Sequence, residues 1–277
     1  MPGDIEGAVS RHYARRDLET IIVKALRASG LDPDALKPDD LAPIDEFHMG
    51  GRPATAAMAE ALVLQPGMRV LDIGCGLGGA ARYFAGQSSC RVTGIDLTPD
   101  YVEAAAALTR RVGLSGLVDF QVASALDLPF ASAGFDAVTL IHVGMNLPDK
   151  HRLCREAARV LKPGGRFALY DVMRVAPGDI AYPTAWAANP ATSFVVEPQA
   201  YREALAAAGF TVTGERDQHE LALGIFRHFQ ARVAERGLPP LGLHLLMGPE
   251  ASTKVANMVA ALEGRTIAPI LMTAVRT

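Results

Sequence analysis

A glycine-rich turn flanked by acidic residues is the part of this chain best suited to chemistry. The stretch VLDIGCGLGG, residues 70–79, has glycines at positions 74, 76, 78 and 79, and Asp72 stands just before the first of them. A second acid, Asp96, ends the stretch RVTGID. A turn of this kind lets backbone N–H groups approach a ligand closely, and it is typical of sites that bind nucleotide cofactors.

The charge of Asp72 separates two possible ligands. A dinucleotide would place its pyrophosphate over the turn, where this carboxylate would repel it. S-adenosylmethionine carries a sulfonium and an ammonium group, and a carboxylate can hold the ammonium directly or through water. Asp96 suits the ribose hydroxyls of either ligand. The sequence therefore favours S-adenosylmethionine, with an NAD-dependent oxidoreductase and a catalytically inactive cofactor-binding module as alternatives.

Regular alternation of apolar runs and helical stretches must position these residues. Short apolar runs bounded by Gly, Pro, Asp or Ser predict strands, and the stretches between them, at 81–86, 101–112 and 149–161, predict helices. Within these runs polar residues rarely alternate with apolar ones, which indicates a parallel sheet covered on both faces. The sequence therefore predicts an α/β doubly wound core. The predicted strands are RVLDIG, RVTGID, VDFQVA, FDAVTLI and RFALYDV.

The segments outside this core predict a helical cap. Residues 10–29 and 50–64 each predict one helix, and 173–196 predicts an irregular insertion. Helices at 199–208, 220–236 and 250–263 and strands at FTVTGERD and TIAPILMTAV are predicted after it. We expect an N-terminal helical cap at 1–64, a cofactor-binding core at 65–217 with a lid insertion at 173–196, and a helical insertion with a closing strand at 218–277, in the same domain.

Composition excludes several classes of function. The formal net charge is −3, and the absence of a Lys/Arg run argues against a nucleic-acid partner. No uncharged stretch approaches the roughly 20 apolar residues of a membrane span, and the first residues lack a secretory apolar region, so we expect a cytoplasmic protein. The three cysteines show no metal-ligand spacing, nor do His12, His151, His219, His228 and His244 among themselves, which predicts no metal. The oligomeric state is not predicted.

Four motifs in order resemble the class I S-adenosylmethionine-dependent methyltransferases. They are VLDIGCGLGG, GIDLTPDYVEAA, ALDLPFASAGFDAV and LKPGGRFALYDV. The chain is most similar to the small-molecule branch that includes the ubiquinone/menaquinone, sterol and glycine-sarcosine enzymes, over about residues 45–210. The resemblance implies a Rossmann-like, seven-stranded, mainly parallel sheet whose last strand is antiparallel. It also implies methyl transfer to an N, O or C atom of a small, partly hydrophobic acceptor.

The resemblance further implies roles for individual residues at the cofactor. Asp96 takes the ribose hydroxyls, and Leu97 lies against the adenine. After the third strand the family often has Gly-Asp-Ala, whose Asp reaches the adenine amino group, whereas this chain has Ala-Ser-Ala at 123–125. Ser124 would offer only a hydroxyl there. The full set implied at the cofactor is Tyr13, His48, Gly50, Gly51, Asp72, Gly74, Cys75, Gly76, Gly78, Asp96, Leu97, Ser124, Ala125, Ile141 and His142.

Catalysis of methyl transfer needs alignment more than a reactive side chain. Well-oriented reactants lower the barrier by roughly 7–11 kcal/mol. Where the acceptor must lose a proton, His142 is the first candidate base, followed by Asp171 and Tyr170. Tyr182, Trp186 and Phe194 predict an aromatic lid, with gap filling as the competing explanation. Arg52 and Arg174 could clamp a carboxylate on the acceptor.

Overall fold

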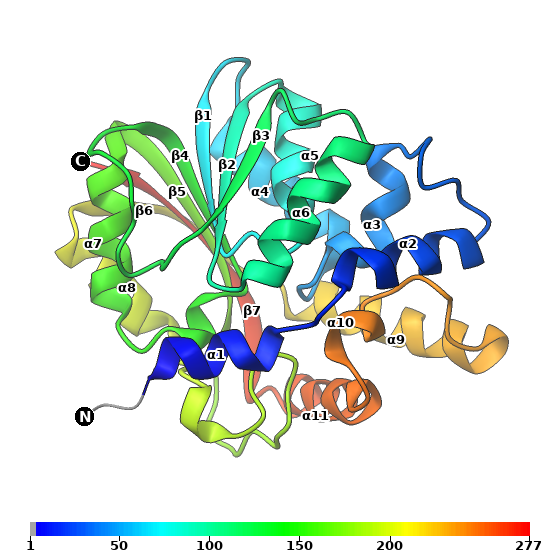
Figure 1. Ribbon diagram of the computed structural model, residues 1–277. Helices are drawn as coiled ribbons and strands as arrows, with labels where there is room; N and C mark the ends of the chain where they lie inside the picture. The colour runs from blue at the N-terminus through cyan, green and yellow to red at the C-terminus, as the bar shows by residue number, and fades with distance from the viewer. Residues whose placement is uncertain (1–3) are drawn as a thin grey trace.

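A seven-stranded sheet organises the protein, whose computed structural model describes residues 4–277 (Figure 1). The first five strands are parallel, and the last strand along the chain, β7, is antiparallel to both of its neighbours. The predicted α/β architecture with an antiparallel closing strand is confirmed. The spatial order is β3 (Val118–Val122), β2 (Arg91–Asp96), β1 (Arg69–Ile73), β4 (Phe135–Ile141), β5 (Leu161–Arg174), β7 (Ile267–Arg276) and β6 (Phe210–Asp217).

The burial of each strand follows its place in the sheet. The central strands β1 and β4 are buried along nearly their whole length, as expected for parallel strands covered on both faces. The edge strands β3 and β6 carry more exposed side chains. Chain order reverses between β1 and β4, and in such sheets this switch point, at the carboxyl ends of the strands, is where ligands bind.

Helices cover both faces of the sheet. One face is packed by α4 (Gly51–Leu62) and α5 (Gly79–Ser88), and the other by α7 (Lys150–Val160) and α8 (Pro198–Ala207). The helix α6 (Pro99–Arg111) packs beside α5, where Arg82 donates hydrogen bonds to the Ala105 carbonyl and the Thr109 hydroxyl. The same guanidinium pairs with the buried Asp45 at 2.5 Å, which fixes the segment ahead of α4 against the core.

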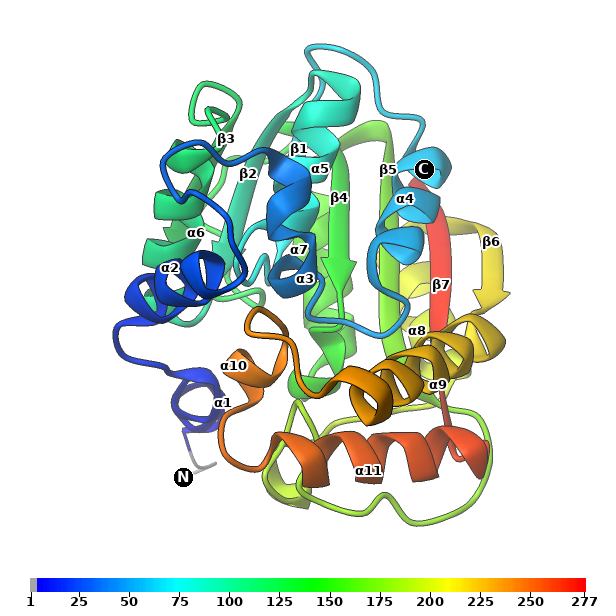
Figure 2. The ribbon, with the colours of Figure 1, turned by 90° about the vertical axis from the view of Figure 1, so that its right-hand side faces the viewer.

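The remaining helices gather at the carboxyl ends of the strands (Figure 2). They are α1 (Ile5–Tyr13), α2 (Leu18–Ala28), α3 (Ala42–Asp45), α9 (His219–Arg236), α10 (His244–Met247) and α11 (Ala251–Glu263). Short 3-10 turns lie at η1 (Pro38–Leu41), η2 (Gly144–Asn146) and η3 (Pro190–Thr192). The irregular insertion predicted at 173–196 is confirmed from residue 175 onward, while residues 173 and 174 end β5.

The single helix predicted at 10–29 is wrong, because two helices with different partners share this stretch. The apolar stripe of α2, including Leu18 and Ile22, packs against α6. In α1 the buried side chain is Val9, and the helix contacts the insertion instead. The chain turns between them, where the Arg15 N–H donates to Asp100 at 2.8 Å.

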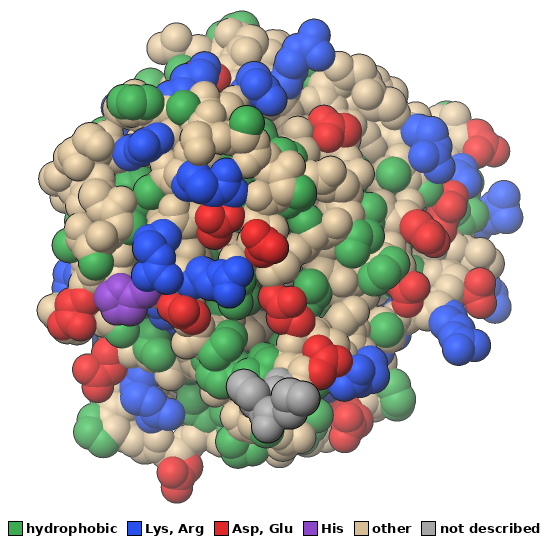
Figure 3. Space-filling model, turned by 60° about the vertical axis from the view of Figure 1, so that its left-hand side comes forward, with side chains coloured by type: hydrophobic (Ala, Val, Ile, Leu, Met, Phe, Trp, Pro, Cys, Tyr) green, Lys and Arg blue, Asp and Glu red, His purple; other side chains and the backbone are tan. Residues whose placement is uncertain are grey.

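Acidic and basic side chains are interspersed on the face of the molecule that Figure 3 presents, with hydrophobic side chains scattered between them. Among the described residues of this face there is no broad patch of one sign, which would steer a polyanion. No helix within residues 4–277 combines the length and apolar character needed to cross a membrane.

Candidate functional site

A large cavity opens at the carboxyl ends of β1, β2 and β4, below the cap helices. Its volume of about 1140 Å³ exceeds the roughly 300–1,000 Å³ usual for one small ligand. Its wall combines the glycine turn after β1 with residues from α1, the segment before α4, and the C-terminal helices. The cavity therefore has room for a cofactor and a second molecule side by side.

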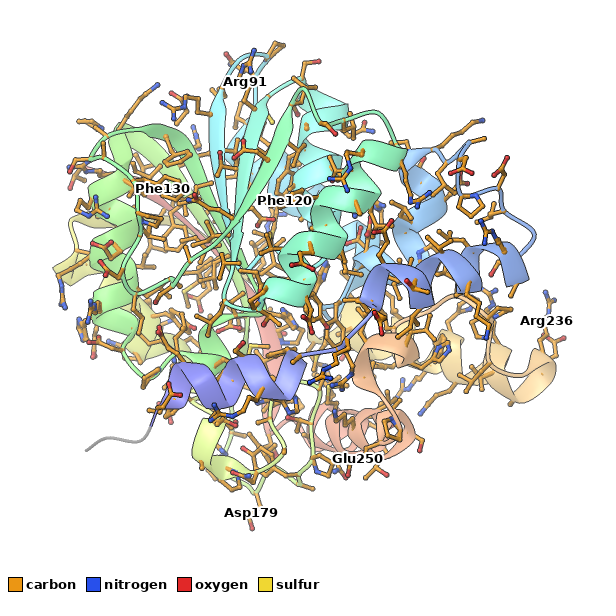
Figure 4. The ribbon with its side chains drawn as sticks, in the orientation of Figure 1. Arg91, Phe120, Phe130, Asp179, Arg236 and Glu250 are labelled. Carbon is orange, nitrogen blue, oxygen red and sulfur yellow. The ribbon has the colours of Figure 1, made fainter. Side chains whose placement is uncertain are left out.

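The glycine turn is shaped so that its backbone borders this cavity. Gly74 has a φ of +71°, and a Cβ there would lie 2.1 Å from a methyl of Val143. Only glycine fits both conditions. The Cys75 N–H donates to the Ile95 carbonyl at 2.8 Å, which ties the turn to β2. Phe120 packs beneath Gly78, where a Cβ would lie 2.4 Å from its ring (Figure 4).

Asp96 is held with both carboxylate oxygens oriented by backbone groups. One oxygen accepts from the Gly76 N–H at 3.0 Å and the other from the Thr98 N–H at 2.9 Å. Burial raises the pKa of Asp96, while these hydrogen bonds oppose the rise. Each oxygen keeps a lone pair for another donor. Asp96 lines the cavity, as a group that binds ribose hydroxyls must.

Asp72 has one satisfied and one unsatisfied oxygen. Its Oδ1 accepts from the Thr139 hydroxyl at 2.7 Å, whereas its Oδ2 is buried without a hydrogen-bond partner among the described residues. Burial raises the pKa of Asp72 to about 7. A buried acceptor without a partner costs about 1–3 kcal/mol. A cationic donor in the cavity would remove this cost, so the site fits a ligand that carries an ammonium group.

A polar cluster before α4 forms a second wall. Glu46 accepts from the Thr55 hydroxyl at 2.6 Å and from His48 Nε2 at 2.9 Å, and it pairs with Arg52 at 2.8 Å. Although burial opposes ionisation, the hydrogen bonds from His48 and Thr55 hold the pKa of Glu46 below its usual value. Arg52 also lies over the Tyr83 ring. Its charge is therefore already paired.

The predicted carboxylate clamp is not assembled. Arg52 is committed to Glu46, and Arg174 donates to the Gly178 carbonyl. Arg174 is also not among the residues that line the cavity. The two predicted glycines, Gly50 and Gly51, do line it and begin α4. A Cβ at Gly50, whose φ is +92°, would lie 2.8 Å from the Tyr170 hydroxyl.

His142 lies at the cavity, but both of its ring nitrogens are engaged. Nδ1 donates to the Tyr170 carbonyl at 3.2 Å, and Nε2 accepts from the Met49 N–H at 3.2 Å. Burial lowers the pKa of His142 to about 3, so the ring is neutral. Its hydrogen bonds fasten the loop before α4 to the end of β4. To accept a proton, Nε2 would first have to release Met49.

Tyr170 and Asp171 point to opposite faces of β5, because side chains alternate along a strand. Tyr170 packs near His48 and His142, with ring centroids 6.0 and 4.9 Å away, and its buried hydroxyl has no partner among the described residues. Asp171 accepts from the Tyr201 hydroxyl on the far face. Neither lines the cavity. The expectation that Asp171 faces the ligand is corrected by this alternation.

At the far end of the cavity, Leu97 and Ala125 line the wall, whereas Ser124 does not. The Ser124 hydroxyl donates to Glu6 at 2.5 Å and accepts from the Leu126 N–H at 3.0 Å. The carboxylate of Glu6 lines the cavity in its place. The sequence reasoning missed Glu6, since nothing in the local pattern of α1 marks it as a site residue.

Tyr13 and Trp186 close the cavity from the cap side. The Tyr13 hydroxyl donates to Asn146 at 2.9 Å, and its ring meets Tyr101 edge-on. Trp186 is 1% exposed and donates its ring N–H to Ser193 at 2.9 Å. Of the three aromatic residues predicted in the insertion, Trp186 lines the cavity, whereas Tyr182 and Phe194 do not. Trp186 therefore forms part of a packed wall.

The opposite end of the cavity is apolar and opens to solvent. Phe229 and Leu238 line it, with 39% and 59% of their surfaces exposed. Met258 and Val255 of α11 line the interior beside them. Arg236, at the end of α9, and Glu250, just before α11, are labelled in Figure 4.

Within residues 4–277, no group of three or more His, Cys, Asp or Glu side chains could hold a metal ion.

The fold is Rossmann-like, and the chain is similar to the class I, S-adenosylmethionine-dependent methyltransferases. Residues 71–169 match the family described as "Methyltransferase domain". S-adenosylmethionine is the methyl donor of this class, and the unpaired Asp72 oxygen, Asp96 and the glycine turn fit its ammonium, ribose and methionyl parts.

A curated relative matches about half of the chain, whereas solved structures match nearly all of it. Methyltransferase GfsG of Streptomyces halstedii is 36% identical over 134 residues, 48% of each chain. The [4+2]-cyclase SpnF is 25% identical, with a TM-score of 0.64 over 92% of each chain. Geranyl diphosphate C-methyltransferase from Streptomyces coelicolor A3(2) shares the fold at 18% identity, with a TM-score of 0.68 over 100% of this chain and 99% of that one. The chain spans about half the length of GfsG.

Proposed function

We propose that this chain transfers a methyl group from S-adenosylmethionine to an N, O or C atom of a small, uncharged, largely hydrophobic acceptor. The observation that carries the proposal is one continuous cavity. It joins the glycine turn with Asp72 and Asp96 at one end to the apolar opening around Phe229 and Val255 at the other.

The donor end of the cavity supports the cofactor assignment. Asp72 Oδ2 is a buried acceptor suited to an ammonium group, and Asp96 is oriented for two ribose hydroxyls. When bound, S-adenosylmethionine supplies an electrophilic methyl group on a sulfonium. A pyrophosphate at the same turn would meet the Asp72 carboxylate, which disfavours a nicotinamide cofactor.

The acceptor end supports a neutral, hydrophobic molecule. Arg52, which lines the cavity beside Glu46, is paired with that carboxylate. Much of the acceptor end is formed by apolar side chains, including Met145, Phe226 and Met258, while the exposed Arg232 and Arg236 also line the pocket. A carboxylate buried among the apolar side chains, away from these two arginines, would cost several kcal/mol. Amino-acid acceptors are therefore disfavoured.

The protein's own contribution is mainly geometric. Trp186 and Tyr13, both held by hydrogen bonds, exclude water and restrict the acceptor to a position in line with the methyl group. His142 remains our first choice for accepting a proton from an acceptor that must lose one, once its contact with Met49 opens.

Turnover to S-adenosylhomocysteine tests the proposal. Purified protein is incubated with S-adenosylmethionine and a panel of acceptors that includes neutral hydrophobic alcohols and phenols and, as matched controls, carboxylates of similar size. We expect product with neutral acceptors and not with carboxylates. Tight binding of NADH by calorimetry, with no binding of S-adenosylmethionine, would contradict the assignment.

A second function deserves the same assay because SpnF, 25% identical over 92% of both chains, is a [4+2]-cyclase. The same cavity has room for a molecule that carries the diene and the alkene joined in a [4+2] cycloaddition. Cofactor binding without S-adenosylhomocysteine formation, together with cofactor-dependent cyclisation of a linear polyene, would favour this alternative over methyl transfer.

A further inference from the structure

We propose that Glu6 of α1, held by Ser124, recognises the amino group of the adenine and thereby couples cofactor binding to the docking of α1. The inference rests on the proposed use of S-adenosylmethionine. It concerns a residue that lies 118 positions from its partner and outside the matched methyltransferase domain.

The contact between Glu6 and Ser124 fixes a carboxylate on the cavity wall. Ser124 donates to Glu6 Oε1 at 2.5 Å, and its own oxygen is fixed by the Leu126 N–H at 3.0 Å. With its single proton pointed at Glu6, the hydroxyl has none left for a ligand. Glu6 is half-buried and borders the cavity. Its other oxygen remains an acceptor.

The position of Glu6 matches the place where the base must lie. Asp96 fixes the ribose at the end of β2, and β3 runs beside it in parallel, with Asp96 in register with Val122. The Ala123 N–H donates to the Asp96 carbonyl at 3.0 Å. A base attached to that ribose therefore extends between Leu97 and residues 123–125.

At this end of the cavity, the side chain of Glu6 is the strong hydrogen-bond acceptor available to the adenine base. Val9, Leu97, Ala123 and Ala125 are apolar, whereas Glu6 carries a carboxylate. The amino group of adenine is a donor, and a carboxylate only accepts, so the two are complementary. A base with an oxygen at the same position would meet two acceptors face to face.

Docking of α1 depends on few contacts, so a ligand that bonds Glu6 should stabilise it. Val9 is the buried side chain of the helix. The Tyr13 ring packs against Phe47 and Tyr101. The polar contacts are Ser10 with the Leu97 carbonyl at 3.5 Å, His12 with the Ala185 carbonyl at 3.0 Å, and Tyr13 with Asn146 at 2.9 Å. A ligand that binds the docked state better shifts the helix toward it.

Paired ligands test the recognition. Calorimetry compares S-adenosylhomocysteine with S-inosylhomocysteine, in which an oxygen replaces the amino group. We expect wild type to prefer the amino ligand by about 10- to 100-fold, as for a hydrogen bond to a charged group. In Glu6→Gln the preference should fall to within about threefold, since an amide both donates and accepts. Glu103→Gln, an exposed acid on α6 away from the cavity, should behave like wild type.

Hydrogen exchange of the amides in α1 tests the coupling. S-adenosylhomocysteine should slow exchange in wild type more than S-inosylhomocysteine does at equal saturation, and the two ligands should act equally in Glu6→Gln. An unchanged amino preference in Glu6→Gln would overturn the inference and leave the proposed function intact. Failure of wild type to bind S-adenosylhomocysteine at all would overturn the proposed function itself.

Discussion

The affinity for S-adenosylhomocysteine should depend on pH through Asp72. Its carboxyl is buried, with Oδ2 unpaired among the described residues, and burial raises its pKa to about 7. In the free protein Asp72 is therefore mostly ionised at pH 7.5 and mostly protonated at pH 5.5. The ligand's ammonium requires the ionised form. Binding should therefore weaken by about tenfold or more between these pH values.

Calorimetric titration across this range measures the effect, with Asp72→Asn as the matched control. The amide can still accept from Thr139 but does not titrate. The nearby titratable groups Asp96, His48 and Glu46 are present in both proteins, so their contributions cancel in the comparison. We expect weaker binding in the variant, without the loss between pH 7.5 and 5.5 that Asp72 adds in the wild type. Parallel pH profiles for the two proteins would refute the reasoning.

The same raised pKa predicts a change in the stability of the free protein. Because the folded-state pKa of Asp72 lies above its ordinary value, its ionisation destabilises the folded state. The protonated Asp72 contributes fully to the free energy of unfolding below about pH 4. This contribution is lost as the pH rises through about 7, and the loss reaches about 4 kcal/mol. Denaturant unfolding should show this loss in wild type relative to Asp72→Asn, and a constant difference between them would contradict it.

Three further substitutions test other parts of the site. Asp96→Asn should weaken S-adenosylhomocysteine binding about tenfold or more in calorimetry, because charge-assisted hydrogen bonds to the ribose are lost. Unchanged affinity would show that Asp96 does not bind the ribose. Arg82→Met should lower the free energy of unfolding by about 3–5 kcal/mol, since Asp45 stays buried without its partner, and the double variant with Asp45→Leu should recover most of it in urea titrations. Val255→Trp should reduce kcat/KM for the acceptor while S-adenosylhomocysteine affinity changes by less than about twofold; an equal loss of both would place Val255 at the cofactor.

Local pattern was enough to predict the core of the fold. Strand and helix periodicities are set by backbone geometry within a few residues, so the alternation from Arg69 to Asp171 predicted the parallel strands and their helices. The sequence also predicted the type of cofactor from the glycine turn and Asp72. A charged side chain next to such a turn restricts the charge of the ligand that can bind there, whatever the rest of the fold. The same alternation rule, applied to adjacent Tyr170 and Asp171, would have shown that both cannot face one ligand.

Contacts between distant segments were decided only by the tertiary structure. Glu6 reaches Ser124 because α1 docks across the ends of the strands, and no spacing within either segment indicates that meeting. His142 could be placed at the end of a strand from the sequence, but the Met49 N–H that occupies its nitrogen comes from 93 residues away. The sequence determined which chemical groups exist and how each local segment folds. Packing determined which groups meet, because burial and hydrogen bonding are satisfied over the whole molecule at once.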